Sequence, residues 1–295
     1  MKFKDTIFLS ILMIILAGCA GGQSQTGDTS TEPQVYIENK GSDTIVNLAL
    51  AWAEEYQALF PDVRISVTGG GSGTGIASLI NNTVDIANAS RGIKDKEIEN
   101  AQANGVEPLE FIIARDAIAV IVNPENPVTN LTLEQISAIY TGEITNWQEV
   151  GGDDLPIVRL SRETNSGTHV YFLEEVLRLG DKENPALFST TTLLLPSSEG
   201  IIREVSQNPN AIGYDGLGYI TEEVKVLGIA GVGSDRYILP SIETVNSGEY
   251  AIARNLFMYT NGEPAGPLAV YLDWILSPAA QEIVRDLGFV PIVQP

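Results

Sequence analysis

Residues 35–91 read VYIENKGSDTIVNLALAWAEEYQALFPDVRISVTGGGSGTGIASLINNTVDIANASR, and this stretch decides the fold class. It alternates helical segments, such as 43–59, with short runs rich in β-branched residues, which lie at 35–38, 63–69 and 84–90. Strands separated by helices of this length are joined by crossover connections, which make neighbouring strands parallel. The sequence therefore predicts an α/β protein with a mainly parallel sheet.

The segment 43–59 has apolar residues at spacings of three and four, which places them on one face of a helix. They are Ile45, Leu48, Ala49, Trp52, Tyr56 and Leu59. We expect this face to pack against the sheet, with Trp52 in the core.

A second block of strands and helices follows residues 111–124, FIIARDAIAVIVNP, where two strand-like runs meet near Arg115 and carry the chain towards another domain. Further helices are expected at 94–104, 133–140, 167–179, 199–207, 267–275 and 279–287, and further strands at 157–160, 191–195 and 256–260. We predict two α/β lobes with a cleft between them. Residues 34–115 and 246–295 would form lobe I, and residues 116–245 would form lobe II.

The N-terminal residues have the pattern of an export signal. Lys2 and Lys4 precede an apolar run at 7–17, which is shorter than the roughly 20 residues that a helix needs to cross a bilayer. The run ends in Leu-Ala-Gly-Cys, which resembles the lipobox of prokaryotic lipoproteins, where the cysteine is lipidated and becomes the new N-terminus. The alternative is an N-terminal anchor helix with an incidental Cys19.

We therefore predict a lipoprotein signal peptide at 1–18 and lipidation of Cys19. Residues 19–33 are rich in Gly, Ser and Thr without apolar periodicity, which is typical of a flexible tether. The folded body is expected outside the cytoplasm, in the periplasm or at the cell surface, anchored to the cytoplasmic membrane by the lipid.

The composition excludes several classes of function. The 295 residues include 17 Lys and Arg against 38 Asp and Glu, a formal net charge of −21. Nucleic acid is not an expected partner, because it binds clustered Lys and Arg. The negative field also repels free anions, so an anion site must be a local arrangement of backbone N–H groups and one or two Arg side chains. With one Cys and one His, we expect no metal site and no cofactor.

Three Gly/Ser/Thr-rich loops, at 41–44, 69–75 and 165–168, each precede a predicted helix. The start of a helix has about four N–H groups without an intrahelical acceptor and a partial positive charge, so such a loop can bind an anion. N-capping explains any one loop alone, because Ser and Thr are common N-caps. Three loops with nearby arginines favour an anion site. The loop at 69–75 lacks the glycine register of a dinucleotide fingerprint.

Two arginines and one aspartate accompany these loops. Arg91 directly follows a strand, and Arg162 stands four residues before Ser166. A guanidinium is a rigid fork of donors that suits a tetrahedral oxyanion, although each Arg could equally be a surface ion-pair partner in so acidic a chain. Asp43 either caps the first helix or accepts a hydrogen bond from a protonated ligand oxygen, which an acid phosphate has and sulfate lacks.

Several motifs together resemble one family. They are GSDT, GGGSGTGIASL followed by DIANASR, TGEITNWQEVGG, RETNSGTH, YAIARNLFMYTNG and ILSPAAQEIVRDLGFVPI. In this order they look like the phosphate-binding proteins of ABC phosphate importers, over nearly all of residues 35–293. The resemblance implies a two-lobed periplasmic-binding-protein fold of type II, a dehydrated inorganic phosphate in the cleft, and delivery to the membrane subunits of an ABC permease.

The resemblance also implies a set of phosphate-binding residues. They are Ser42, Asp43, Thr44, Ser72, Arg91, Arg162, Ser166, Gly167 and Thr168. The sequence departs from the enteric pattern, which has Asp at the position of Arg91 and no acid at that of Asp43. We therefore assign the acceptance of the phosphate proton to Asp43.

Two other functions stay open at this point. A binding protein for sulfate, molybdate or an organophosphate would use similar loops. An exported hydrolase would need a base such as His169 for Ser166 or Ser42, but neighbours on one helical turn seldom form such a chain, and His169 is expected to face solvent. We expect a monomeric binding protein and no enzyme.

Overall fold

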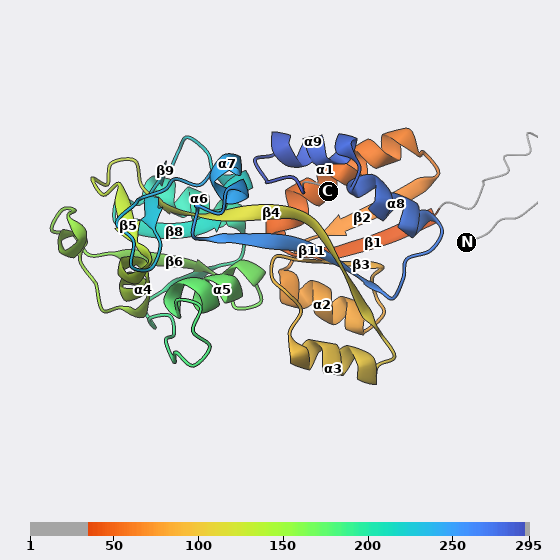
Figure 1. Ribbon diagram of the computed structural model, residues 1–295, viewed down its shortest axis with the longest axis horizontal. Helices are drawn as coiled ribbons and strands as arrows, with labels where there is room; N and C mark the ends of the chain where they lie inside the picture. Colours follow the sequence, from red (N-terminus) through yellow and green to blue (C-terminus); the bar gives the residue numbers. More distant parts are fainter. Residues whose placement is uncertain (1–34, 293–295) are drawn as a thin grey trace, which may run out of the picture. The chain divides into compact units, whose positions relative to one another are not determined.

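A computed structural model describes residues 35–292 of the chain, which belong to one compact unit (Figure 1). The strands are β1 (Val35–Gly41), β2 (Val63–Thr68), β3 (Ile86–Ala89), β4 (Pro108–Val122), β5 (Asn130–Thr132), β6 (Val158–Arg162), β7 (Leu193–Leu195), β8 (Ala211–Gly216), β9 (Lys225–Val226), β10 (Gly228–Ala230) and β11 (Ala253–Asn261). The predicted signal peptide, tether and lipidated Cys19 lie outside the described residues.

Helices follow most strands, as the alternating pattern predicts. The α-helices are α1 (Asp43–Leu59), α2 (Ser72–Ile80), α3 (Asp95–Ala103), α4 (Leu133–Thr141), α5 (Gly167–Tyr171), α6 (Ser198–Gln207), α7 (Ile242–Asn246), α8 (Pro267–Ile275) and α9 (Pro278–Asp286). Two 3₁₀ turns, η1 (Trp147–Val150) and η3 (Leu217–Tyr219), and a π-helix, η2 (Phe172–Leu177), complete the elements. The α/β class predicted from the sequence is confirmed.

Most strands form a mixed sheet with the order β2-β1-β3-β11-β4-β8-β6-β7, and β9 also pairs with β4. The strands β5 and β10 form a separate two-stranded parallel sheet. The pairs β1/β2, β1/β3, β6/β7 and β6/β8 are parallel, whereas β4 and β11 run antiparallel to their neighbours. The expectation of a mainly parallel sheet therefore describes the outer strands only. The two runs expected to meet near Arg115 form one continuous strand, β4.

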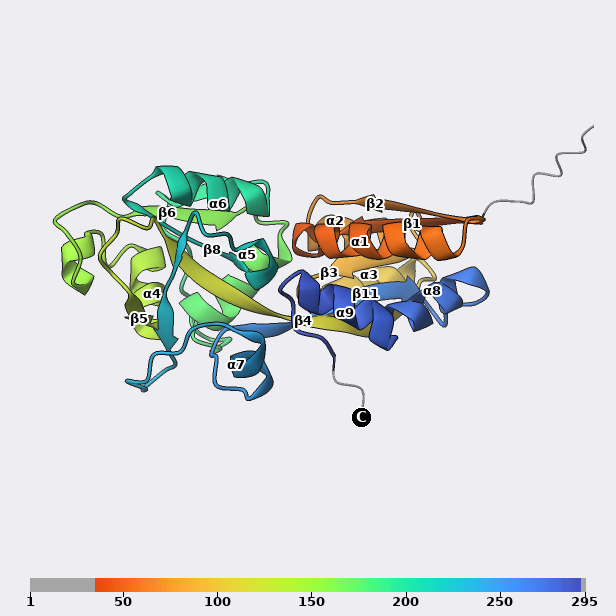
Figure 2. The same ribbon diagram turned by 90° about the horizontal axis from the view of Figure 1, so that it is seen from above.

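β4 and β11 pass side by side between two lobes (Figures 1 and 2). We call the part built from β1–β3, α1–α3, α8 and α9 lobe I, and the part built from β5–β8 and α4–α7 lobe II. β4 pairs with β11 up to Ala117 and with β8 from Ile118 onward, so its pairing partner changes between these two residues. The residue boundaries predicted for the lobes stay a prediction.

Lobe I has helices on both faces of its strands. The apolar face of α1 packs with α8 and α9 in one cluster, where the Trp52 indole N–H donates to the Ala280 carbonyl at 2.9 Å. Because successive strand residues point to opposite faces, Ile86 joins this cluster while Ala87 and Ala89 pack with α2 and α3. Trp52 is fully buried, as predicted.

Lobe II has its own core. Tyr140, Phe172 and Tyr214 pack within it, and the rings of Phe172 and Tyr214 stack with centroids 3.5 Å apart. The helix expected at 167–179 is divided: α5 ends at Tyr171 and continues as the π-helix η2. No local feature of the sequence indicates this change in helix type.

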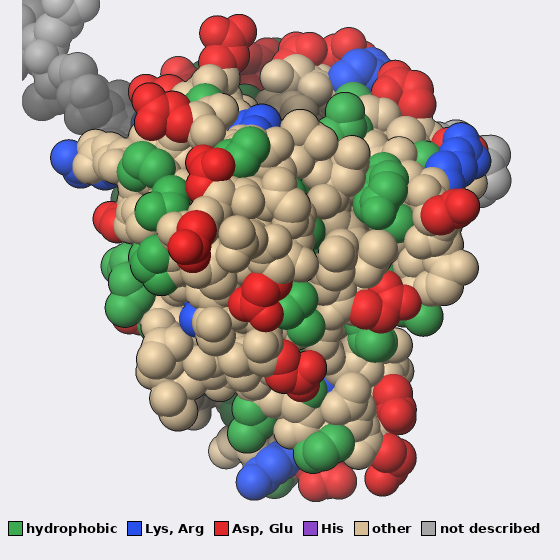
Figure 3. All heavy atoms as spheres, turned by 90° about the vertical axis from the view of Figure 1, so that its left-hand side faces the viewer, with side chains coloured by type: hydrophobic (Ala, Val, Ile, Leu, Met, Phe, Trp, Pro, Cys, Tyr) green, Lys and Arg blue, Asp and Glu red, His purple; other side chains and the backbone are tan. Residues whose placement is uncertain are grey.

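The surface agrees with the acidic composition. On the face drawn in Figure 3, Asp and Glu side chains are scattered and outnumber Lys and Arg, which form no cluster there. Among residues 35–292, no helix combines the length and the apolar character that a membrane span requires.

Candidate anion site between the lobes

The three Gly/Ser/Thr-rich loops meet at one place, although they belong to both lobes. Thr44 at the start of α1 and Thr168 at the start of α5 have their hydroxyl oxygens 2.9 Å apart. The Gly73 N–H donates to the Asn165 carbonyl at 3.0 Å, and the Asn165 amide donates to the Gly70 carbonyl at 2.9 Å. The structure thus brings the starts of α1, α2 and α5 together.

This close approach requires glycine at position 167. A Cβ added there would lie 2.4 Å from the Ser72 hydroxyl oxygen and 2.5 Å from that of Ser90. Ser72 is itself held in place, because its Oγ accepts a hydrogen bond from the Ser90 N–H at 3.0 Å. Any larger residue at 167 would therefore push the two lobes apart.

The first turns of α1, α2 and α5 have backbone N–H groups without a hydrogen-bond acceptor among the described residues. No acceptor is found among the described residues for the backbone N–H groups of Thr44, Ser72 and Gly167. Ser166 is the N-cap of α5, where its Oγ accepts from the Thr168 N–H at 3.2 Å, whereas Ser42 precedes α1 without a side-chain cap bond. Buried N–H groups with no protein acceptor at the first turn of a helix suit an anion.

Asp43 connects the lobes. Its Oδ2 accepts from Arg162 Nη2 at 2.7 Å, and its Oδ1 accepts from the Gly70 N–H at 2.8 Å. The alternative that Asp43 caps α1 is wrong, because Ser42 is the N-cap and the carboxylate binds the second loop and lobe II instead. Two of the three charged residues that we assigned to the ligand are thus paired with each other.

Arg162 is almost fully enclosed, with 1% of its side chain exposed. Its Nη1 donates to the Ser198 hydroxyl at 2.8 Å, and its Nη2 also donates to the Pro196 carbonyl at 2.8 Å. Asp215 lies 3.7 Å from Nη1, and burial raises the pKa of this carboxyl while Arg162 opposes the rise. Most of the guanidinium donors therefore have protein acceptors in this conformation.

Arg91 is paired within lobe I. Its Nη1 and Nη2 donate to the two carboxylate oxygens of Glu97 at 2.8 and 2.7 Å. Burial raises the pKa of Glu97, but the hydrogen bonds and charge of Arg91 and the N–H of Lys94 outweigh it, so the pKa is lowered. The Arg91 Nε is buried without a hydrogen-bond partner among the described residues, and of the two N–H groups of Nη2 only one has an acceptor among them.

His169 does not face solvent, so that expectation is wrong. It is 7% exposed, its Nδ1 lies 3.0 Å from the Ser161 hydroxyl, and its ring stacks on Phe188 with centroids 4.5 Å apart. Burial lowers its pKa. The side chain points into the core of lobe II because α5 is covered on that face, which the sequence pattern of five residues was too short to reveal.

Sequence reasoning missed several residues of the interface. Arg254 on β11 and Asp116 on β4 form a buried ion pair of 2.9 Å beside the loops. Asn165 and Ser90 join the loops, as described above. Only Asn165 had a signal, since it lies within a loop already singled out; the others are polar residues inside or directly after strands, where spacing carries no information about partners.

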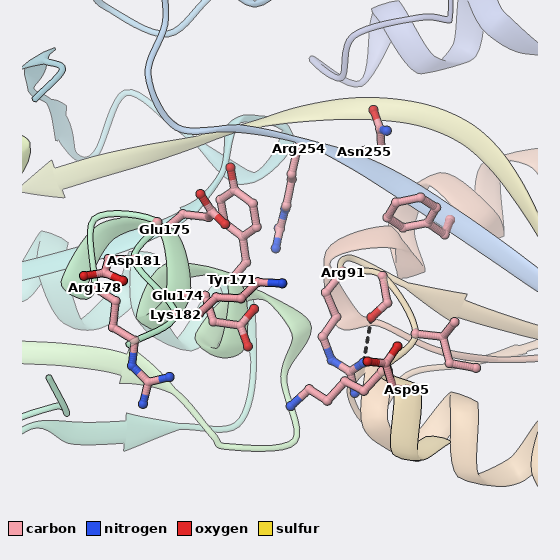
Figure 4. Close-up of a pocket in the computed structure, with 15 residues that line it drawn as sticks. Arg91, Asp95, Tyr171, Glu174, Glu175, Arg178, Asp181, Lys182, Arg254 and Asn255 are labelled. Carbon is pink, nitrogen blue, oxygen red and sulfur yellow. Dashed lines mark hydrogen bonds between the residues drawn. The ribbon is translucent and has the colours of Figure 1, made fainter. Parts of the chain in front are cut away.

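A cavity of about 570 Å³ opens beside the loops (Figure 4). Residues of both lobes and of β11 line it, among them Arg91, Tyr171, Lys182 and Arg254. In Figure 4, Arg254 extends from β11 into the space between Tyr171 and Arg91. The cavity thus reaches Arg91 and Arg254, whereas Arg162 and the residues of the three loops do not line it.

Comparisons with known proteins agree on one family. The model of the PBP superfamily domain matches residues 26–279. The chain is 33% identical over 273 residues to the phosphate-binding protein PstS of Pseudomonas aeruginosa, covering 87% of this chain and 83% of that protein. It is 31% identical over 299 residues to PstS of Bacillus subtilis, covering 99% and 94%.

A solved structure supports the same fold. It is a putative phosphate ABC transporter substrate-binding protein with bound phosphate from Clostridium perfringens, with a TM-score of 0.76 and 33% identity. The match covers 88% of this chain and 100% of that one. The two-lobed type II fold predicted from the sequence is confirmed.

Proposed function

Since the chain belongs to the PBP superfamily and, within it, to the phosphate-binding proteins of ABC transporters, we propose that it captures inorganic phosphate outside the cytoplasm and delivers it to an ABC permease. In this proposal the protein is a monomeric lipoprotein, held at the cytoplasmic membrane through Cys19 and a tether at 19–33. It performs no catalysis. Residues 34–115 and 246–295 would close against residues 116–245 around the ligand.

One observation carries the proposal: the starts of three helices from two lobes converge with free N–H groups and hydroxyls. A bare oxyanion between the lobes would accept hydrogen bonds from the N–H groups of Thr44, Ser72 and Gly167, and from hydroxyls of the same loops. The residues proposed as ligands are Ser42, Asp43, Thr44, Ser72, Arg91, Arg162, Ser166, Gly167 and Thr168. No general basic patch is needed, which suits a chain of net charge −21.

Asp43 gives the site its selectivity in this proposal. A carboxylate has about four lone-pair sites, and Gly70 and Arg162 occupy one on each oxygen. A remaining site can accept the proton of mono- or dibasic phosphate. Sulfate has no proton at neutral pH, so its oxygens would face the carboxylate without a hydrogen bond, which costs affinity.

The alternative function as a hydrolase lacks a general base, because the candidate for that role was His169. His169 contacts Ser161 in the core of lobe II, and no hydrogen bond joins it to Ser42 or Ser166 among the described residues. A nucleophile without an adjacent base is poorly activated. Binding without turnover is the function that the side chains support.

Calorimetric titration tests the proposal directly. The purified protein, freed of bound anion, is titrated with phosphate and with sulfate, and free phosphate is assayed after incubation with phosphate esters. We expect tight binding of phosphate, weak binding of sulfate, and no release of phosphate from esters. Absence of phosphate binding, or a preference for sulfate, would refute the proposal.

The membrane anchor needs a separate test. The Cys19→Ser variant should lose the lipid and leave the membrane fraction of expressing bacterial cells, while purified variant protein keeps its phosphate affinity. Retention of the variant in the membrane fraction would favour the alternative of an N-terminal anchor helix.

A further inference from the structure

We propose that Arg254, which lies outside the ligand set implied by the family resemblance, is a positioning residue of the anion site. It holds the Thr44 and Thr168 hydroxyls so that one of them donates its proton to the ligand, and it ties all three loops to the strand that crosses between the lobes. This inference rests on the proposed phosphate-binding function.

A single guanidinium contacts groups associated with each of the three loops. Arg254 Nη2 lies 3.3 Å from the Thr44 Oγ1 and 3.0 Å from the Thr168 Oγ1. Its Nη1 donates to the Ser90 carbonyl at 3.0 Å, and the Ser90 N–H in turn donates to the Ser72 Oγ. Arg254 is therefore joined directly to the starts of α1 and α5, and through Ser90 to the start of α2.

The side chain is held from the opposite side. In the β4/β11 ladder, Arg254 stands in register with Asp116, and Asp116 Oδ2 accepts from Nη2 at 2.9 Å and from Nε at 3.3 Å. The Asp116 carboxyl is fully buried, and burial raises its pKa while Arg254 opposes the rise. The guanidinium carbon also lies 5.6 Å from the centre of the Tyr171 ring. These contacts fix the direction in which Arg254 points.

The direction of the hydrogen bonds follows from the chemistry of the groups. A guanidinium can only donate. One N–H of Arg254 Nη2 is directed at Asp116, so the two threonine oxygens share the other N–H as acceptors. The two hydroxyls are also 2.9 Å apart, so one of them donates to the other. Each hydroxyl has a single proton, and the accepting threonine therefore keeps its proton for a third group. With 1% and 0% exposure at Thr44 and Thr168, that group is not bulk water.

A negatively charged oxygen beside the loops is the acceptor that this arrangement fits. Without Arg254, each threonine hydroxyl could rotate so that its proton points to the other threonine or to a nearby carbonyl. The donor that is oriented towards the ligand would then be lost. Removal of Arg254 should therefore weaken anion binding more than removal of an equally buried arginine elsewhere. Arg159 is such a control, since it is 5% exposed and bonds to the Ile144 carbonyl within lobe II.

The first experiment compares Arg254→Lys with Arg159→Lys by calorimetric titration with phosphate, after thermal melting shows that each variant is folded. We expect the dissociation constant to rise at least 30-fold for Arg254→Lys and less than threefold for Arg159→Lys. Equal effects of the two variants would overturn the inference. If the wild-type protein fails to bind phosphate, the proposed function fails instead, so the two failures are distinguishable.

A second experiment keeps Arg254 and therefore does not depend on the folding of its variants. It titrates Thr44→Val, Thr168→Val and the double variant with phosphate. In each single variant the remaining hydroxyl can still accept from Arg254 and donate to the ligand, so phosphate affinity should fall less than about fivefold. In the double variant, phosphate affinity should fall by a factor far larger than the product of the two single factors. If the loss of phosphate affinity in the double variant equals the product of the two single losses, the hydroxyls act independently, and the shared-proton arrangement is overturned.

Discussion

Arg162 and Arg91 each bind a carboxylate, but they do so in different regions of the molecule. Arg162 reaches from lobe II to Asp43 of lobe I, whereas Arg91 and Glu97 both belong to lobe I. Any separation of the lobes would break the first pair and leave the second intact. The contacts between the lobes are therefore the ones whose free energy can be linked to ligand binding, whereas a pair within one lobe contributes to its stability with or without ligand.

The largest effect is expected for Arg162→Ala. The substitution leaves Asp43 and the buried Asp215 without their cation, and we expect phosphate binding to weaken by about 2–4 kcal/mol, as when one partner of a buried charge pair is removed. Calorimetric titration measures the loss. Arg203→Ala, at an exposed position on α6, is the control with the same change in net charge. A change of less than tenfold for Arg162→Ala would restrict Arg162 to joining the lobes.

Asp43→Asn comes second. The amide can still accept a hydrogen bond and can also donate one, so we expect a smaller loss of phosphate affinity, about 1–2 kcal/mol, and a measurable gain in sulfate binding. Wild type and variant are each titrated with both anions at neutral pH. If the preference for phosphate over sulfate stays the same, Asp43 acts through Arg162 alone and another acceptor selects the ligand.

Arg91→Ala should weaken phosphate binding less than Arg162→Ala, and no more than Asp43→Asn. Its Nε and one N–H of Nη2 have no acceptor among the described residues, and we expect the loss to correspond to about one charge-assisted hydrogen bond to the ligand, about 1–2 kcal/mol. The variant should also change the dependence of stability on pH. The pKa of Glu97 is lowered in the folded protein, so its contribution is present above its ordinary value of 4.5 and is lost as the pH falls below it.

Chemical denaturation of wild type and Arg91→Ala at several pH values measures this contribution. The difference in unfolding free energy should be full near neutral pH and shrink below about pH 4.5. A difference that does not depend on pH would mean that Arg91 stabilises lobe I by packing rather than through the Glu97 carboxylate.

The sequence predicted the elements of each lobe well, because their signals are local. The spacing of Ile45, Leu48 and Trp52 identifies the buried face of α1, and the Gly/Ser/Thr loops mark the starts of α1, α2 and α5. Contacts between the lobes had no such signal. Asp43 and Arg162 are 119 positions apart, and nothing in their neighbourhoods specifies that they meet.

Arg254 and Asp116 show the same limit more sharply. They are 138 positions apart and lie within strands, where a charged residue is read as a surface position. Only the pairing of β4 with β11 places them in register and encloses them between the lobes. Polar residues in the middle of apolar strands are therefore the feature to examine when a two-lobed protein is predicted from its sequence.

The smallest effect on binding is expected one residue beyond Thr168. His169 points away from the loops into lobe II, so His169→Gln, which can still hydrogen bond to Ser161, should change the phosphate dissociation constant by less than about twofold.

The substitution should instead change how the stability of the protein depends on pH. Burial lowers the pKa of His169 below its ordinary value of 6.5, so the unfolded chain binds its proton first and the folded state loses stability as the pH falls below about 6.5. Denaturation at about pH 7.5 and about pH 5.5 should show a smaller loss for His169→Gln than for wild type. A tenfold loss of phosphate affinity in His169→Gln would instead mean that the imidazole affects the interface between the lobes through its contact with Ser161, which precedes Arg162 in β6. The distinction between contacts within one lobe and contacts between the lobes would then no longer hold.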